Sequence, residues 1–197
     1  MCDTVPGHKN ARSLFESMPN SEMTDTLWDF SVATYRRPGV QEACLALQDG
    51  MDADVNILMY CCWRGRLKRE EFELLLAALA PWQYTVVRGL RSVRRALKPM
   101  LAELDEFSAD AGGLRKKVAA LELEAEKLQQ AMLGRHAADH AAGPPSPRSA
   151  ADNLACYFTC LAKAPDGEAQ KALKILIGAA FPDDGEEAIE AAIATLK

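Results

Sequence analysis

Six cysteines and three histidines are the side chains in this 197-residue sequence best suited to bind a metal or attack a substrate. No two cysteines have the CxxC spacing of common zinc sites. Cys44, Cys61 and Cys62 lie among apolar residues, so we expect small buried side chains, with a redox or metal role as the alternative.

The three-residue gap between His136 and His140 would place both imidazoles on one face of a helix, where they could share a metal. The local sequence is HAADH, which lacks the glutamate of the metalloprotease motif HExxH. The segment precedes a proline-rich stretch, so we expect a solvated helix end and assign no metal site.

Other catalytic patterns are missing from the sequence. It has no glycine-rich phosphate loop and no serine in a nucleophile-elbow context. Acidic pairs such as Asp52 with Asp54 and Asp183 with Asp184 are typical of helix caps and turns. We therefore expect no catalytic residues and no cofactor, and a protein that is not an enzyme.

Asn56 is the polar residue inside the most apolar segment of the sequence. It either bonds the end of a neighbouring helix or faces a small-ligand pocket. Tryptophans are expected mainly as anchors of the core. The candidate lining of such a pocket is Trp28, Tyr35, Asn56, Tyr60 and Trp63.

Charge is distributed unevenly along the sequence. The chain has a net charge of −5, yet residues 64–98 contain nine basic and three acidic residues between acidic flanks. Such a block could bind phosphates of a nucleic acid, although no helix-turn-helix, zinc finger or aromatic platform accompanies it. The candidate basic surface is Arg88, Arg91, Arg94, Arg95 and Lys98.

Apolar residues recur with helical spacing, and no segment alternates with period two, so the sequence predicts an all-α fold. Thr26 and Asp29 have the spacing of a helix-capping box. Pro38-Gly39, Gly50 and Gly65 are predicted to separate the early helices. The helix of residues 55–63 is apolar on most sides and should be central and buried. Pro81 should begin a new helix.

Residues 82–133 contain two heptad seams, which predict a long antiparallel helical hairpin. Gly112-Gly113 is the expected turn, and Pro99 should bend the first arm only mildly. A turn near residue 110 would place Arg95 and Lys98 beside Glu122 to Glu126. The seam residues are Val86, Leu90, Val93, Leu97, Met100, Leu104 and Phe107, then Leu114, Val118, Leu121, Ala125, Leu128 and Met132.

The predicted organisation is a compact helical bundle with this long hairpin and a small C-terminal helical module. Residues 1–22 should be a flexible tail, 23–135 the helical core, 136–149 a linker and 150–197 a module of three short helices. Fewer than fifty residues rarely form an independent core, so the module should dock on the main body or on a partner.

Targeting signals are also missing from the sequence. The N-terminal residues lack the apolar core of a signal peptide, and no stretch reaches the roughly 20 apolar residues of a membrane span. We expect a cytoplasmic protein with no membrane span, whose cysteines remain reduced.

Several separated motifs carry a resemblance to a known family. They are LWDF at 27–30, RPGV at 37–40, ACLALQ at 43–48, ADVN at 53–56, PWQ at 81–83 and LELEAE at 121–126. In these motifs, over residues 26–133, the sequence resembles a family of short, uncharacterised proteobacterial cytoplasmic proteins known only as a domain of unknown function. The resemblance implies a bacterial origin and contributes no catalytic residues.

The leading hypothesis for function is a non-enzymatic helical interaction or scaffold protein that can associate with itself or with another protein. The first alternative is a small-ligand or lipid-like binding protein, or an enzyme, with a pocket near Asn56. The second is weak nucleic-acid association through the basic segment 64–98.

Overall fold

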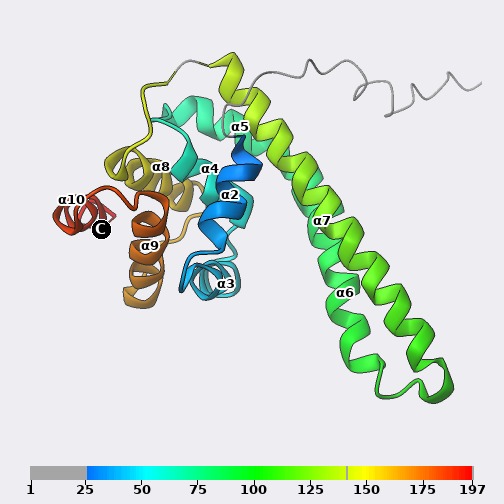
Figure 1. The fold of residues 1–197 in the computed structure, drawn as a ribbon. Helices are drawn as coiled ribbons and strands as arrows, with labels where there is room; N and C mark the ends of the chain where they lie inside the picture. Colours follow the sequence, from blue (N-terminus) through cyan, green and yellow to red (C-terminus); the bar gives the residue numbers. More distant parts are fainter. Residues whose placement is uncertain (1–25, 141, 197) are drawn as a thin grey trace, which may run out of the picture.

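The computed structural model of the protein describes residues 26–140 and 142–196, so the predicted tail of residues 1–22 lies outside the described residues. Every regular element in this part of the chain is helical, which confirms the all-α prediction (Figure 1). A π-helical segment η1 (Gln83–Val87) and a 3-10 turn η2 (Asp105–Phe107) flank the first hairpin arm. The α-helices are α2 (Leu27–Tyr35), α3 (Val40–Met51), α4 (Val55–Trp63), α5 (Arg69–Trp82), α6 (Arg88–Met100), α7 (Ser108–Asp139), α8 (Pro147–Cys160), α9 (Gly167–Ala180) and α10 (Glu186–Ile193).

Short polar side chains define where α2 and α4 begin. The Thr26 hydroxyl accepts a hydrogen bond from the backbone N–H of Asp29 at 3.2 Å, as the capping-box spacing predicts. Asp54 caps α4 by accepting from the N–H of Asn56 at 2.9 Å. The prediction that Gly50 ends the preceding helix is wrong. That helix, α3, continues to Met51, and Asp52 ends it in a left-handed conformation with φ of 53°.

Helix α4 lies at the centre of the molecule, and residues 56–62 are all buried. Cys61 and Cys62 belong to this buried set and Cys44 of α3 is buried beside them, all three as free thiols. Helices α2, α7, α8 and α9 pack against α4 (Figure 1). An element that is apolar on most sides needs neighbours on most sides, which is why the sequence could predict this central position.

The helix of the first hairpin arm does not begin at Pro81. Pro81 lies inside α5, and the chain continues from α5 through η1 into α6 without a break in the helical backbone. A proline cannot donate the bond to the carbonyl four residues earlier. The wider π-helical turn that follows accommodates this defect, so the chain shifts its bonding pattern instead of ending the helix.

Helices α6 and α7 form an antiparallel hairpin that projects away from the other helices (Figure 1). The predicted turn at Gly112-Gly113 is wrong, because both glycines lie inside α7. The chain turns earlier, after Pro99 ends α6 within one residue, and Asp105 adopts a positive φ of 41° there. The Ser108 hydroxyl closes the turn by donating to the carbonyl of Leu101 at 2.8 Å.

An earlier turn also changes the pairing of the two arms. Arg91, and not Arg95, contacts Glu122 and Glu126, so the register differs from the expected one by about one helical turn. The indole N–H of Trp82 donates to the carbonyl of Ala125 at 3.1 Å and anchors the base of the hairpin.

The C-terminal helices α8, α9 and α10 share one hydrophobic core with α2 to α5. Helix α8 begins at Pro147, three residues before the predicted boundary, with Ser146 as its cap. The buried Asn153 of α8 joins it to the end of α4, since its amide donates to the carbonyl oxygens of Cys61 and Gly65, each at 3.1 Å. In the described residues, no helix has the length and apolar character that crossing a membrane requires.

Candidate functional site

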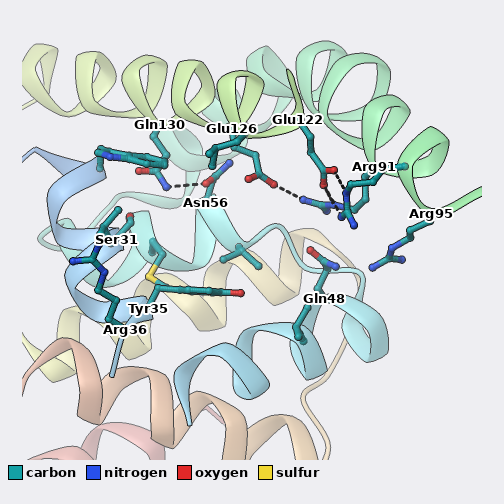
Figure 2. A pocket seen from close by; sticks show the side chains of 17 residues that line it. Ser31, Tyr35, Arg36, Gln48, Asn56, Arg91, Arg95, Glu122, Glu126 and Gln130 are labelled. Carbon is teal, nitrogen blue, oxygen red and sulfur yellow. Dashed lines mark hydrogen bonds and ion pairs between the residues drawn. The ribbon is translucent and has the colours of Figure 1, made fainter. Parts of the chain in front are cut away.

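A cavity of about 480 Å³ lies between the body and the base of the hairpin (Figure 2). Helix α2 contributes Ser31 and Tyr35, and α3 contributes Gln48. Asn56 of α4 forms the floor, while α7 and α6 close the remaining sides. Its volume is in the range of pockets that hold small molecules.

A buried network of amides positions the floor of this cavity. The Asn56 side chain donates to Gln129 Oε1 at 3.0 Å and accepts from Gln130 Nε2 at 2.8 Å. Gln129 in turn donates to the Asp54 carboxylate at 2.5 Å. These bonds link α4 to α7, so the base of the hairpin cannot move without disturbing the cavity.

Burial raises the pKa of Asp54, which lies at the end of this network. Hydrogen bonds from Gln129 and from the N–H of Asn56 offset part of that rise. The backbone N–H of Asp54 donates to the hydroxyl of Tyr157 at 2.8 Å, which extends the network into α8.

Two buried polar atoms on the cavity wall have no hydrogen-bond partner among the described residues. They are the hydroxyl oxygen of Ser31 and Oε1 of Gln130. The two residues are only 6% and 5% exposed. Leaving a buried polar atom unsatisfied costs about 1–3 kcal/mol, so a ligand group that reached either atom would recover part of that cost.

An ion-pair cluster forms the side of the cavity beneath the hairpin. Arg91 bonds Glu122 at 2.9 Å and Glu126 at 2.6 Å (Figure 2), and Arg94 also pairs with Glu122. Although burial opposes ionisation, bonds from Arg94 and Arg91 lower the pKa of Glu122. Burial raises the pKa of Glu126, which Arg91 offsets only in part. Both carboxylates are occupied in holding the two arms together.

Aromatic side chains line the α2 side of the cavity. Trp28 lies under the ammonium of Lys127, which is 4.8 Å from the ring centroid. Tyr35 is half-buried, and burial raises its pKa, so its phenol stays protonated at neutral pH. The exposed Arg36 follows at the end of α2. This side offers apolar rings next to a cation.

The structure separates the five residues predicted to line a pocket. Trp28, Tyr35 and Asn56 line the cavity, whereas Tyr60 and Trp63 do not. Tyr60 is fully buried and contacts Trp63 with ring centroids 6.3 Å apart. The hydroxyl of Tyr60 lies 2.9 Å from Nδ1 of His136, so this side chain is directed towards the end of α7 and not into the cavity.

Carboxylates partner most of the predicted basic surface. Arg88 bonds Asp52 at 2.9 Å, Arg95 bonds Asp49 at 3.1 Å, and Arg91 and Arg94 pair across the hairpin as described above. Lys98 is exposed near the end of α6. The arginines of α6 are thus largely neutralised by acidic groups from α7 and from the C-terminal end of α3.

Sequence reasoning missed the cavity residues of α7. Glu122, Glu126 and Gln130 are spaced four residues apart, so they share one helix face beside the heptad seam. That spacing was a readable signal for a polar wall. Ser31 offered no such signal, because its burial depends on how α2 packs.

Comparisons with known proteins match parts of the chain. The chaperone protein HscA homolog of Pseudomonas putida is 37% identical over 81 residues, which are 41% of this chain and 12% of that protein. The chaperone protein HscA of Proteus mirabilis is 45% identical over 65 residues, 33% of this chain and 9% of that protein. The chain therefore spans about a tenth of the length of these relatives. No solved structure matches it.

A family described as proteins of unknown function, DUF2390, matches residues 26–133. The matched range contains all of the motifs in which the resemblance was seen, together with every residue of the cavity. It covers more than half of the sequence, and the chain belongs to this family.

Proposed function

We propose that the protein binds a small, anionic, amphipathic molecule in the cavity beneath the hairpin, without catalysing a reaction. The observation that carries the proposal is the pair of unpartnered polar atoms, Ser31 Oγ and Gln130 Oε1, on its wall. A ligand hydrogen-bond donor would satisfy Gln130 Oε1. The hydroxyl of Ser31 can bond either a donor or an acceptor.

The remaining lining indicates the class of ligand. Trp28 and Tyr35 provide an apolar surface for a ring or a short chain. Four arginines line the cavity against two glutamates, and Arg36 has no ion pair among the described residues. The other three arginines are paired with carboxylates, so the charge that favours an acidic group on the ligand is that of Arg36.

The experiment uses 1-anilinonaphthalene-8-sulfonate, an anionic aromatic probe. We expect one probe to bind per chain, and binding to fall at least tenfold in Val32→Trp, which would fill the cavity. Val93→Trp, on the outer side of the hairpin, is the matched control and should bind normally. Equal binding by both variants would contradict the proposal, as would native mass spectra of freshly purified protein that show apoprotein alone and no probe complex.

A second candidate function is association between two copies through the hairpin. Val93, Met100, Leu114 and Leu121 form what we name the apolar hairpin face, and each keeps about half of its surface exposed. At 3.6 residues per turn, these residues lie roughly half a turn away from Arg91 and Glu126, and so face away from the cavity. This arrangement supports a docking surface separate from the ligand site.

A second copy is the partner that the apolar hairpin face fits best. Val93 and Met100 are seven residues apart, and so are Leu114 and Leu121. Two such hairpins could therefore pack as a four-helix bundle with matching layers. Burying a fully exposed leucine contributes about 1.5–3 kcal/mol. These side chains are already half buried, so each contributes about half of that, and all four are needed for a reversible dimer.

The proposal places the protein in the cytoplasm, where thiols such as Cys61 remain reduced.

Sedimentation equilibrium tests this second candidate. We expect wild-type protein to dimerise reversibly, and the double variant Leu114→Lys/Leu121→Lys to remain monomeric with unchanged helicity. Leu74→Lys changes a leucine that is 74% exposed on α5 and serves as the matched control, which should still dimerise. A wild-type protein that stays monomeric at high concentration would exclude self-association.

A further inference from the structure

Glu71, His136 and His140 form a cluster at the end of the hairpin remote from its tip. Their possible ligand atoms lie within 4.8 Å of one another. Helix α7 continues to Asp139, with His140 as its cap, so the two histidines keep the spacing of one helix face. Their rings stack with centroids 4.3 Å apart and 21° between planes. The solvated helix end expected from the sequence is thus packed against α5 and α4.

Hydrogen bonds orient both imidazoles in the way a metal site requires. Nδ1 of His140 donates to the carbonyl oxygen of His136 at 3.0 Å, which leaves its Nε2 with a free lone pair. Nδ1 of His136 lies 2.9 Å from the hydroxyl of Tyr60. Metal-bound histidines commonly use one ring nitrogen for the metal and bond an oxygen through the other.

The neighbours of the cluster hold these groups in place. Tyr60 is fully buried in α4, and burial raises its pKa to about 12, so its hydroxyl stays neutral beside His136. The Arg64 guanidinium donates to the carbonyl oxygen of His140 and fixes the helix end that carries this histidine.

Glu71 provides an independent sign that a cation belongs here. Its Oε1 is buried and accepts no hydrogen bond among the described residues. The same oxygen lies 3.8 Å from Nε2 of His136, too far for a hydrogen bond. A buried carboxylate oxygen without a donor is costly, and a metal ion between this oxygen and the two Nε2 atoms would give the oxygen a partner.

We propose that Glu71, His136 and His140 bind one divalent first-row metal ion of the Zn²⁺ class through Oε1 and the two Nε2 atoms. Two nitrogens and one carboxylate oxygen are a ligand set that zinc uses where its fourth position stays open to water. Ligands on tetrahedral zinc lie about 3.3 Å apart, given bonds of about 2.0 Å. Side-chain adjustments of about 1 Å close the site, and the bound ion links α5 to α7.

Calorimetric titration of the full chain with Zn²⁺ tests the proposal. We expect one ion per chain, with affinity at least tenfold lower in Glu71→Gln and in His140→Ala. His140 is exposed and Glu71→Gln keeps the shape of the side chain, so both variants should fold, which circular dichroism checks.

Cysteine thiols could also bind the Zn²⁺, and a control variant distinguishes binding by thiols from binding by the proposed site. Cys156 and Cys160 lie four residues apart on α8. The double variant Cys156→Ser/Cys160→Ser should bind Zn²⁺ as the wild type does, and bound Co²⁺ should show no thiolate charge-transfer band. Absence of one-to-one binding in the wild type would overturn the proposal. So would unchanged affinity in both ligand variants, or loss of the ion in the cysteine variant.

Discussion

The buried carboxylate of Asp54 caps α4 and also accepts a hydrogen bond from Gln129 of α7. One side chain thus joins these two helices. Burial raises its pKa, and two hydrogen bonds with the charges of Arg91 and Arg88 oppose that rise. The folded protein therefore holds the Asp54 proton more tightly than the unfolded chain does. The contribution of Asp54 to the free energy of unfolding is fully present below the ordinary aspartate pKa of about 3.9. It declines as the pH rises above that value.

The raised pKa of Asp54 leads to a prediction for the variant Asp54→Asn. The free energy of unfolding of the wild type minus that of the variant should decrease as the pH is raised from 4 towards 7, measured by urea denaturation at each pH. Asp183→Asn, in the exposed turn before α10, controls for the loss of one negative charge. A difference that grows with pH would show instead that the amide network lowers the pKa of Asp54.

At the scale of elements, the hairpin depends on where α6 stops. Pro99 ends that helix, and the turn forms at residues 101–107, before the glycine pair. Gly112 and Gly113 then lie in the first turns of α7 with no positive φ, and added Cβ atoms would meet open space. The glycines weaken α7 and take no part in reversing the chain.

We therefore expect Gly112→Ala and Gly113→Ala each to stabilise the protein by about 0.5–1 kcal/mol, the usual gain for this change inside a helix. Thermal unfolding followed by circular dichroism measures the gain. Gly39→Ala is the contrasting control. Gly39 has φ of +79°, which disfavours any residue with a Cβ atom, so this variant should be less stable than the wild type. If both hairpin variants were less stable than the wild type, the result would indicate that the chain reverses at the glycine pair.

At the scale of the whole molecule, the C-terminal helices complete the core instead of standing apart. Leu154 and Phe158 of α8 and Leu173 and Ile177 of α9 are buried in the same cluster as Leu47 of α3. Arg37 reaches across to donate to the carbonyl of Ala179 at 2.7 Å. Removing these helices would expose the central helix α4 to water.

The fragment 1–146 should accordingly lose cooperative unfolding and near-ultraviolet circular dichroism while keeping part of its helicity. Adding a separately produced fragment of residues 147–197 should restore a cooperative transition, because the missing apolar surfaces are then supplied in trans. Cooperative unfolding of 1–146 alone, with wild-type midpoint, would show that the core does not depend on α8 and α9.

Local patterns in the sequence determined the helices and much of their burial. The spacing of apolar residues identified an all-α fold and the buried central helix, and the spacing of Thr26 and Asp29 identified the cap of α2. Heptad spacing identified two arms that pair antiparallel. These features follow from interactions within a few residues along one helix, so a linear sequence displays them directly.

Only the tertiary structure decided which side chains meet. Asn56 reaches Gln129 and Gln130 across more than seventy residues, and no local pattern encodes that approach. Because the chain reverses earlier than expected, the register of the hairpin differs by about one helical turn. Arg91, and not Arg95, therefore pairs with Glu122 and Glu126. The cavity and the cluster of Glu71 with two histidines exist because packing brings distant helix faces together, and packing is a property of the whole core.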